Sequence, residues 1–344
     1  MNNRYQEVCE QLARKPARWL VTGAAGFIGS NLLQKLLSLD QEVVGLDNLS
    51  TGFTKNLDQV RGLVTPAQWA RFRFVNGDIQ NLETCREACR SADYLLHQAA
   101  LGSVPRSIED PVTSNASNVD GFVSICWAAH LEKVKSAVYA SSSAVYGDHP
   151  ALPKREEAIG ESLSPYGATK LMNEIYAGVF SRCYGMKLTG LRYFNVFGPR
   201  QDPDGAYAAV IPKWIASMIR NQPIQINGDG ETSRDFCYIA NVVQANILAA
   251  TDPGLPTGHR VFNVALDQRL TLNQLFQLLR ERLMNDHPHL KKVAPLYAEF
   301  RAGDVRHSQA DISLIRKVLG YEPTYNVSAG LDEALSWYQA NLKG

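Results

Sequence analysis

Tyr166 and Lys170 form the residue pair in this sequence that is best suited to acid–base chemistry. They stand four positions apart in Tyr166-Gly-Ala-Thr-Lys170, and in a helix this spacing brings both side chains onto one face. A tyrosine with a pKa of about 10 is a poor base at neutral pH, but a nearby ammonium favours the phenolate. The pair can then accept a proton from a hydroxyl that a serine of the run 141–143 holds. Because this spacing alone is also typical of a solvated helix face, the prediction depends on its surroundings.

A glycine-rich segment near the start of the chain predicts a second kind of chemistry, the binding of a dinucleotide. The segment reads Thr22-Gly23-Ala24-Ala25-Gly26-Phe27-Ile28-Gly29 and lies between an expected strand and an expected helix. Gly23 permits a tight turn, Gly26 lets a pyrophosphate approach the backbone, and Gly29 lets the helix pack closely on the sheet. The helix N-terminus would offer free N–H groups and a positive dipole end to the phosphates. A glycine-rich turn without a ligand is the alternative, which the strand–loop–helix context disfavours.

Asp47 stands about eighteen residues beyond Gly29, near the spacing at which such motifs place an acidic residue. A carboxylate there binds the adenosine ribose and repels a 2′-phosphate, so NAD is expected rather than NADP. A turn-capping role is the alternative, since Asn48 and Ser50 follow. Further contacts to the cofactor are expected from residues that follow the second, third and fourth strands: Asn48, Asp78, Ile79, Gln98, Ala99 and Ala100.

Short apolar runs alternate with helical patterns in the first half of the chain, and this alternation predicts the elements that position these residues. Strands are expected at 19–22, 42–46, 72–75, 94–97, 137–140 and 187–191, with helices at 27–37 and 165–183. The spacings leave room for the crossovers that parallel strands need. The fold class is therefore α/β, a Rossmann-type doubly wound parallel sheet. Its strand ends would bring the serine run beside the glycine-rich loop.

The second half of the chain predicts a smaller, mixed α/β substrate domain. From about residue 198 the loops become richer in Gly, Pro and Asp, and a last helix is expected at 327–340. We divide the chain into an N-terminal extension (1–17), an NAD-binding domain (18–197) and a mainly sugar-nucleotide-binding domain (198–344), with possible chain exchange between the last two. The extension is interpreted as a short amphipathic helix or a loose tail.

Composition narrows the functional classes. Apolar residues make up 45% of the chain and the formal net charge is +1, without a long basic run. Neither nucleic acid nor a membrane surface is therefore an expected partner, and no apolar stretch is long enough for a membrane span. The six cysteines lack paired metal-site spacing, so we expect reduced thiols, no metal and a cytoplasmic location.

Together these residues resemble the extended branch of the short-chain dehydrogenase/reductase family, over nearly the whole chain. Within that branch the sequence is most similar to the nucleotide-sugar 4-epimerases, especially the bacterial UDP-N-acetylglucosamine 4-epimerases of surface-polysaccharide synthesis. The matching stretches are Thr22-Gly-Ala-Ala-Gly-Phe-Ile-Gly29, His97-Gln-Ala-Ala100, Ser141-Ser-Ser-Ala-Val-Tyr-Gly147, Tyr166-Gly-Ala-Thr-Lys170, Leu191-Arg-Tyr-Phe-Asn-Val-Phe-Gly198, Ser233-Arg-Asp-Phe236 and Arg301-Ala-Gly-Asp304.

The resemblance implies roles for individual residues. Tyr166 would be the base, Lys170 its partner and a ligand of the nicotinamide ribose, and Ser142 the hydroxyl beside O4 of the sugar. Asn118 and Tyr193 would border a tightly bound NAD. The UDP-sugar would be held by Gly102, Ser103, Ser142, Ser143, Asn195, Ala209, Val210, Arg234, Arg301, Asp304 and Ser308. Arginines suit a diphosphate because their planar fork donates two hydrogen bonds at once. A homodimer through helices near 118–131 and 165–183 is also implied.

The resemblance also separates possible reactions. Dehydratase relatives carry Asp and Glu directly after the central hydroxyl residue, whereas Ser143 and Ala144 follow Ser142 here. A 4-keto sugar formed in this site would therefore return to a hexose, with C4 inverted if the sugar turns over first. Ser308 replaces a bulky aromatic of relatives restricted to non-acetylated sugars, so a UDP-N-acetylhexosamine is the expected substrate.

Other substrates and functions stay open at this point. UDP-glucose or a UDP-uronic acid is the alternative substrate, and Arg106 or His307 could serve a carboxylate. A non-catalytic NAD-binding regulatory protein and an ordinary alcohol dehydrogenase are the alternative functions. The intact tyrosine and lysine disfavour the regulatory protein.

Overall fold

The computed structural model describes residues 4–205, 208–254, 258–300 and 305–342. Within them, seven parallel strands form one sheet in the order β11-β6-β5-β4-β1-β2-β3. The strands are β1 (Arg18–Thr22), β2 (Glu42–Asp47), β3 (Phe72–Asn76), β4 (Tyr94–His97), β5 (Ser136–Ser142), β6 (Lys187–Tyr193) and β11 (Gly258–Val264). The order reverses between β1 and β4, which is where sheets of this type bind ligands.

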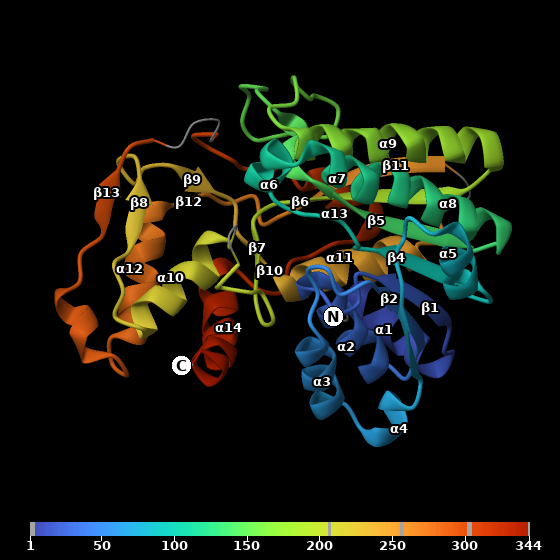
Figure 1. Ribbon diagram of the computed structural model, residues 1–344, viewed down its shortest axis with the longest axis horizontal. Helices are drawn as coiled ribbons and strands as arrows, with labels where there is room; N and C mark the ends of the chain where they lie inside the picture. Colours follow the sequence, from blue (N-terminus) through green and yellow to red (C-terminus); the bar gives the residue numbers. More distant parts are fainter. Residues whose placement is uncertain (1–3, 206–207, 255–257, 301–304, 343–344) are drawn as a thin grey trace.

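Helices cover both faces of the sheet, as the alternation of strands and helices predicts (Figure 1). One face carries α1 (Arg4–Arg14), α2 (Phe27–Ser38), α3 (Thr54–Leu63), α4 (Pro66–Trp69) and α11 (Ile239–Thr251). The other carries α5 (Leu82–Cys89), α6 (Val104–Glu109), α7 (Pro111–Asn115), α8 (Gly121–Leu131) and α9 (Pro165–Tyr184). Successive residues of β1 enter opposite cores, Trp19 and Val21 on the α2 side and Leu20 on the α5 side. The sheet is therefore buried on both faces.

The remaining elements form a smaller lobe beside the sheet, on the left in Figure 1. Its helices are α10 (Val210–Ile219), α12 (Leu272–Leu283), α14 (Val327–Asn341) and the 3₁₀ turn η3 (Pro288–Lys292), with α13 (Ser313–Leu319) nearer the sheet. Three short strand pairs join the loops: β7 (Val196–Phe197) with β10 (Cys237–Tyr238), β9 (Ser233–Arg234) with β12 (Leu270–Thr271), and β8 (Gln225–Asn227) with β13 (Leu296–Ala298).

The six expected strands are all confirmed, but the seventh was not expected. β11 and α11 belong to the second half of the chain, yet β11 pairs in parallel with β6 and α11 packs against the sheet. The chain therefore leaves the sheet after β6, builds part of the small lobe, and returns.

The N-terminal extension is a helix rather than a loose tail. Val8 and Leu12 of α1 are buried against the core. The buried amide of Gln41 accepts hydrogen bonds from Ala17 N and Trp19 Nε1 at 3.0 and 3.2 Å, and donates one to Leu12 O at 2.9 Å. These bonds fasten α1 to the start of β1 and the loop before β2.

No helix of the described residues is long and apolar enough to cross a membrane. All six cysteines are free thiols, as expected. Burial raises the pKa of Cys85, for example, to about 12, so this thiol stays protonated at neutral pH.

Candidate active site

Tyr166 and Lys170 lie in the first two turns of α9. The helix begins after Ser164, whose Oγ accepts a hydrogen bond from Gly167 N at 3.1 Å, and Pro165 occupies its first position. Lys170 is 3% exposed, and its Nζ donates to Ala140 O at 2.9 Å. The ammonium lies 5.9 Å from the centre of the Tyr166 ring. Lys170 therefore connects α9, to which it belongs, with β5.

Ser142 ends β5 and begins the 3₁₀ turn η2 (Ser143–Tyr146), where its Oγ accepts from Ala144 N at 3.1 Å. The same side chain lies near enough to Tyr166 to lower the pKa of its hydroxyl. The structure therefore brings together the three predicted catalytic residues, although they come from a strand end and a helix more than twenty residues apart.

Burial acts against both charged forms of the tyrosine–lysine pair. It raises the pKa of Tyr166, which the hydrogen bond from Ser142 counteracts. It lowers the pKa of Lys170 from 10.5 to about 8. Proton exchange between such groups is feasible near neutral pH because the pKa of the lysine has moved toward the working range.

A second set of contacts fixes the start of α9. Ser107 Oγ, from α6, accepts a hydrogen bond from Tyr166 N at 3.0 Å. Asn118 lies in the π-helical turn η1 (Ala116–Asp120) and donates to Thr169 Oγ1 at 3.1 Å. Its side chain also pairs with the backbone of Leu101, accepting from N at 2.7 Å and donating to O at 3.1 Å. Asn118 therefore ties the loop after β4 to the catalytic helix.

Most of the predicted cofactor residues line a cleft of about 330 Å³ at the carboxyl ends of the strands. It contains Gly23, Gly26, Phe27, Ile28, Gly29, Asp47, Asn48, Ile79, Gln98, Ala99, Ala100 and also Gly102. Gly23 has a φ of +68°, and a Cβ there would lie 2.8 Å from Ala99 N. A Cβ on Gly29 would lie 2.0 Å from Gly23 O. Only glycine fits these two positions.

The geometry of this cleft fits a dinucleotide. Among the described residues, no side chain caps the N-terminus of α2, so its first N–H groups are available to a phosphate. Asp47 accepts from Ala25 N at 2.9 Å and from Leu49 N at 2.8 Å, which holds the glycine-rich loop against the end of β2. Burial raises the pKa of Asp47, while those backbone bonds oppose the shift.

Five predicted cofactor residues do not line this cleft: Asp78, Asn118, Tyr166, Lys170 and Tyr193. Asp78 accepts from Asn48 Nδ2 at 2.8 Å. Tyr193 donates to Gln98 Oε1 at 3.0 Å and accepts from Asn246 Nδ2 at 2.8 Å. Tyr193 is 8% exposed, so its hydrogen bond holds Gln98 from the buried side of the cleft.

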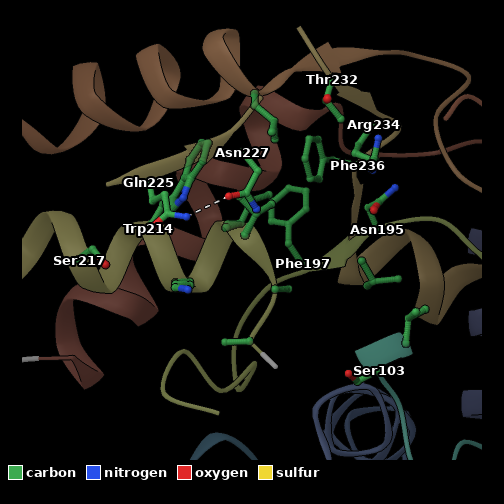
Figure 2. A pocket seen from close by; sticks show the side chains of 18 of the residues that line it. Ser103, Asn195, Phe197, Trp214, Ser217, Gln225, Asn227, Thr232, Arg234 and Phe236 are labelled. Atoms are coloured by element: carbon green, nitrogen blue, oxygen red, sulfur yellow. Dashed lines mark hydrogen bonds between the residues drawn. The ribbon is translucent and has the colours of Figure 1, made fainter. Parts of the chain in front are cut away.

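A larger cavity of about 690 Å³ opens between the sheet and the small lobe. Of the predicted substrate residues, Ser103, Asn195, Ala209, Val210 and Arg234 line it. Figure 2 shows side chains of α10 on one side of this cavity, with Asn195, Arg234 and Ser103 on the other. Gly102 lines the cofactor cleft and Ser103 the larger cavity, so both spaces border this segment of the chain.

The remaining predicted substrate residues either do not line this cavity or lie outside the described residues. Ser143 is half-buried in η2, next to Ser142. Ser308 N donates to Ser233 O at 3.0 Å, which places Ser308 beside the strand of Arg234. Arg301 and Asp304 lie outside the described residues.

Several lining residues were not predicted from the sequence: Lys213, Trp214, Ser217, Pro223, Gln225, Asn227, Thr232, Phe236 and Leu272. Gln225 donates to Asn227 Oδ1 at 3.0 Å, the dashed line in Figure 2. The sequence pattern could have indicated Gln225 and Asn227. They flank Ile226, which is fully buried, in a short strand, so both point to the face opposite Ile226. Trp214 gave no such signal, since an aromatic residue on a helix is usually core.

Comparison with known proteins gives a consistent result. The model of the NAD-dependent epimerase/dehydratase family matches residues 19–265. A putative UDP-glucose 4-epimerase of Methanocaldococcus jannaschii is 33% identical over 324 residues, covering 94% of this chain and 98% of the relative.

Solved structures agree with this relationship. A UDP-N-acetylglucosamine 4-epimerase of Methanobrevibacter ruminantium, in complex with UDP-N-acetylmuramic acid, is 35% identical with a TM-score of 0.85, covering 95% of this chain and 99% of its own. A UDP-glucuronic acid 4-epimerase of Bacillus cereus, with UDP-glucuronic acid and NAD, is 29% identical with a TM-score of 0.83, covering 94% and 99%.

Proposed function

This chain belongs to the NAD-dependent epimerase/dehydratase family, and from that premise we propose that it inverts C4 of a UDP-N-acetylhexosamine through a 4-keto sugar. Its cofactor is NAD, as the family's description states. The observation that carries the proposal is that Ser142, Tyr166 and Lys170 lie together between β5 and α9: Ser142 lowers the pKa of Tyr166, and the Lys170 ammonium lies 5.9 Å from the centre of the tyrosine ring.

The chain's own residues supply the proton chemistry and the grip on the substrate. When bound, NAD supplies a group that reversibly accepts a hydride from C4. Tyr166 takes the proton of O4, Ser142 holds that oxygen, and the charge of Lys170 favours the phenolate. Arg234 and Asn195, with Arg301 and Asp304, hold the nucleotide and its diphosphate. Because these residues do not grip the hexose ring, the keto sugar can turn about the diphosphate and present its other face.

We infer further that NAD stays bound between turnovers, because each cycle regenerates it. The cleft supports this inference through the locked glycine-rich loop and the Asn118 bonds that hold the loop after β4. Residues 18–197 would then carry the cofactor, and the cavity residues of 198–344 most of the UDP-sugar.

Small side chains around the sugar support the preference for an N-acetyl group. Apart from Gly102 itself and its two chain neighbours, no atom of the described residues lies within 4 Å of a Cβ built on Gly102. Ala209 lines the larger cavity, and Ser308 is a half-buried residue bonded to the strand of Arg234. A bulky residue at any of these positions would fill space that an acetamido group needs.

A uronic acid fits less well with the surroundings of His307. Its Nδ1 bonds Ser233 Oγ at 2.8 Å. Burial lowers the pKa of His307, and the nearby Arg269, Arg306 and Arg234 lower it further, so the ring is neutral at pH 7. A neutral imidazole is a weak partner for a carboxylate. UDP-glucose and a UDP-uronic acid stay the alternative substrates, because relatives of this chain are named as epimerases of each.

We also propose a homodimer, formed through the outer face of α8 and α9. Five large side chains of α9 are exposed there: Met172, Ile175, Tyr176, Val179 and Tyr184. With Trp127 of α8, three of them line a shallow apolar groove. Exposed apolar surface of this kind is typical of an interface. Leu171, by contrast, packs against the core.

The test is a comparison of UDP-N-acetylglucosamine, UDP-glucose and UDP-glucuronic acid as substrates, without added NAD and with products resolved by chromatography. We expect the N-acetylgalactosamine isomer to form fastest, and the Tyr166→Phe variant to form none. Ser308→Tyr should suppress turnover of the acetylated sugar far more than that of UDP-glucose. Faster turnover of UDP-glucose by the wild type would overturn the substrate proposal, and no product from any of the three would overturn the reaction.

A further inference from the structure

A buried ion pair lies directly behind the catalytic residues. Glu174 on α9 and Arg192 on β6 have side chains that are 8% and 4% exposed. Arg192 donates through Nε to Glu174 Oε1 at 2.9 Å and through NH2 to Oε2 at 2.8 Å. The hydroxyl of Ser141 adds a third bond to the carboxylate, at 2.5 Å from Oε1. Burial opposes the charge of Arg192, but the bonds to Glu174 outweigh it and raise its pKa.

These three residues join the elements that carry the catalytic groups. Glu174 follows Lys170 by one helical turn, and Ser141 directly precedes Ser142. In the sheet, Ser141 stands opposite Arg192, and Ser142 opposite Tyr193. The carboxylate of Glu174 therefore holds α9 at a fixed height over the ends of β5 and β6.

Arg192 is itself held by further contacts. Its guanidinium carbon lies 4.8 Å from the centre of the Tyr146 ring, and NH1 donates to Glu156 O at 3.1 Å. The Tyr146 hydroxyl donates to Asn263 Oδ1 of β11 at 2.6 Å. The planar guanidinium can satisfy all these partners in one orientation only, so Glu174 meets a pre-oriented fork.

Stability does not require charges at this position. Two charges lose their hydration when they are buried, and well-packed apolar residues of similar volume often replace such a pair at no cost. What apolar residues do not reproduce is direction, because a bidentate pair fixes both distance and angle.

We propose that Glu174 is a positioning residue, which acts through Arg192 and Ser141 to hold Tyr166 and Lys170 in register with Ser142. The kinetic consequence rests on the proposed epimerase function, whereas the effect on the ionisation of Tyr166 does not. A shift of α9 relative to β5 would separate the tyrosine from the serine hydroxyl and from the lysine, and so impair the proton transfer.

The test compares three variants of the full-length holoenzyme. Glu174→Leu with Arg192→Met removes both charges and retains apolar bulk, so that the protein still folds. Ser141→Ala removes one bond and leaves the ion pair in place. The control is Asn241→Leu: Asn241 is a fully buried residue near the start of α11, and its side chain bonds Tyr325 O at 2.8 Å and Thr324 N at 3.0 Å.

For the double variant we expect kcat to fall by about 100-fold with KM changed by less than about threefold, because a misplacement of about 1 Å costs this much. The kcat of Ser141→Ala should fall by about fivefold, since one hydrogen bond is worth about 1 kcal/mol. Asn241→Leu should lose thermal stability and keep its kcat. A double variant with the kcat of the wild type, or a control that loses as much, would refute the proposal.

A second measurement separates this proposal from the proposed function. The ionisation of Tyr166 is followed by the ultraviolet absorbance of tyrosinate, as the difference between each protein and its Tyr166→Phe form. We expect the double variant to raise the pKa of Tyr166 by about one unit, because the phenolate loses Ser142 and Lys170. If the wild type turns over no UDP-sugar, this titration still decides the role of Glu174, and an unchanged pKa refutes it.

Discussion

Replacing Lys170 with methionine should make the protein more stable at neutral pH while it abolishes turnover. The pKa of the buried Lys170 falls from 10.5 to about 8, and this shift corresponds to about 3 kcal/mol spent on keeping the ammonium inside the fold. Lys170→Met recovers that energy but loses the hydrogen bond to Ala140 O, worth about 1 kcal/mol. The net expectation is a gain of about 2 kcal/mol in the free energy of unfolding at pH 7.

The sign of the pH dependence provides the sharper test. Between pH 8 and 10.5 the unfolded chain keeps the proton of Lys170 and the folded chain does not, so wild-type stability rises with pH over this window. The advantage of Lys170→Met over the wild type should therefore shrink as the pH rises, and become slightly negative near pH 10.5.

Urea unfolding of the NAD-free proteins across this pH window measures the difference. Tyr166→Phe is the control, because it leaves Lys170 in place and should keep the wild-type slope up to about pH 9, below the range in which an unfolded tyrosine ionises. A difference between Lys170→Met and the wild type that stays constant with pH, or a variant less stable at pH 7, would refute the reasoning. Turnover should fall by at least about 100-fold, the usual loss when proton transfer is disabled.

Three further outcomes follow from the structure. Gly29→Ala should prevent folding or NAD retention, because its Cβ would lie 2.0 Å from Gly23 O; absorbance of bound nucleotide in the purified protein checks this. Asn118→Ala should weaken NAD binding by about tenfold, since it frees the backbone of Leu101 at about 1–2 kcal/mol; calorimetric titration of NAD measures it. Ile175→Asp, at an exposed apolar position of α9, should yield a monomer in sedimentation analysis with its NAD intact.

Local sequence patterns were sufficient for most of the sheet. The strands β1, β2, β4 and β5 read as apolar runs because both faces of a parallel sheet are buried. β11 was missed because its first half is polar: His259 and Arg260 precede the buried Phe262 and Val264. Its partner β6 also lies more than sixty residues earlier, and no local pattern encodes such a pairing.

The site residues also fall into those that a local motif predicts and those that only a distant contact reveals. The glycine-rich loop and the tyrosine–lysine pair are local motifs, and the sequence predicted both. Ser107 and Glu174 act through neighbours 59 and 33 positions away, at Tyr166 N and Ser141 Oγ. Their types are ordinary for a helix, so only the packing of α6 and α9 on the sheet reveals what they contact.

The path of the chain bears on how a sugar could be inverted without release. The chain returns from the small lobe to supply α11 and β11. It therefore crosses between the sheet and the small lobe several times, and the two are not joined by a single hinge. The bond network of Gln98, Tyr193 and Asn246 also ties the cofactor cleft to α11. Walls fixed in this way favour a mechanism in which the sugar turns and the protein does not. We therefore expect the space around Gly102 and Ser308, rather than a domain movement, to determine which sugars can turn.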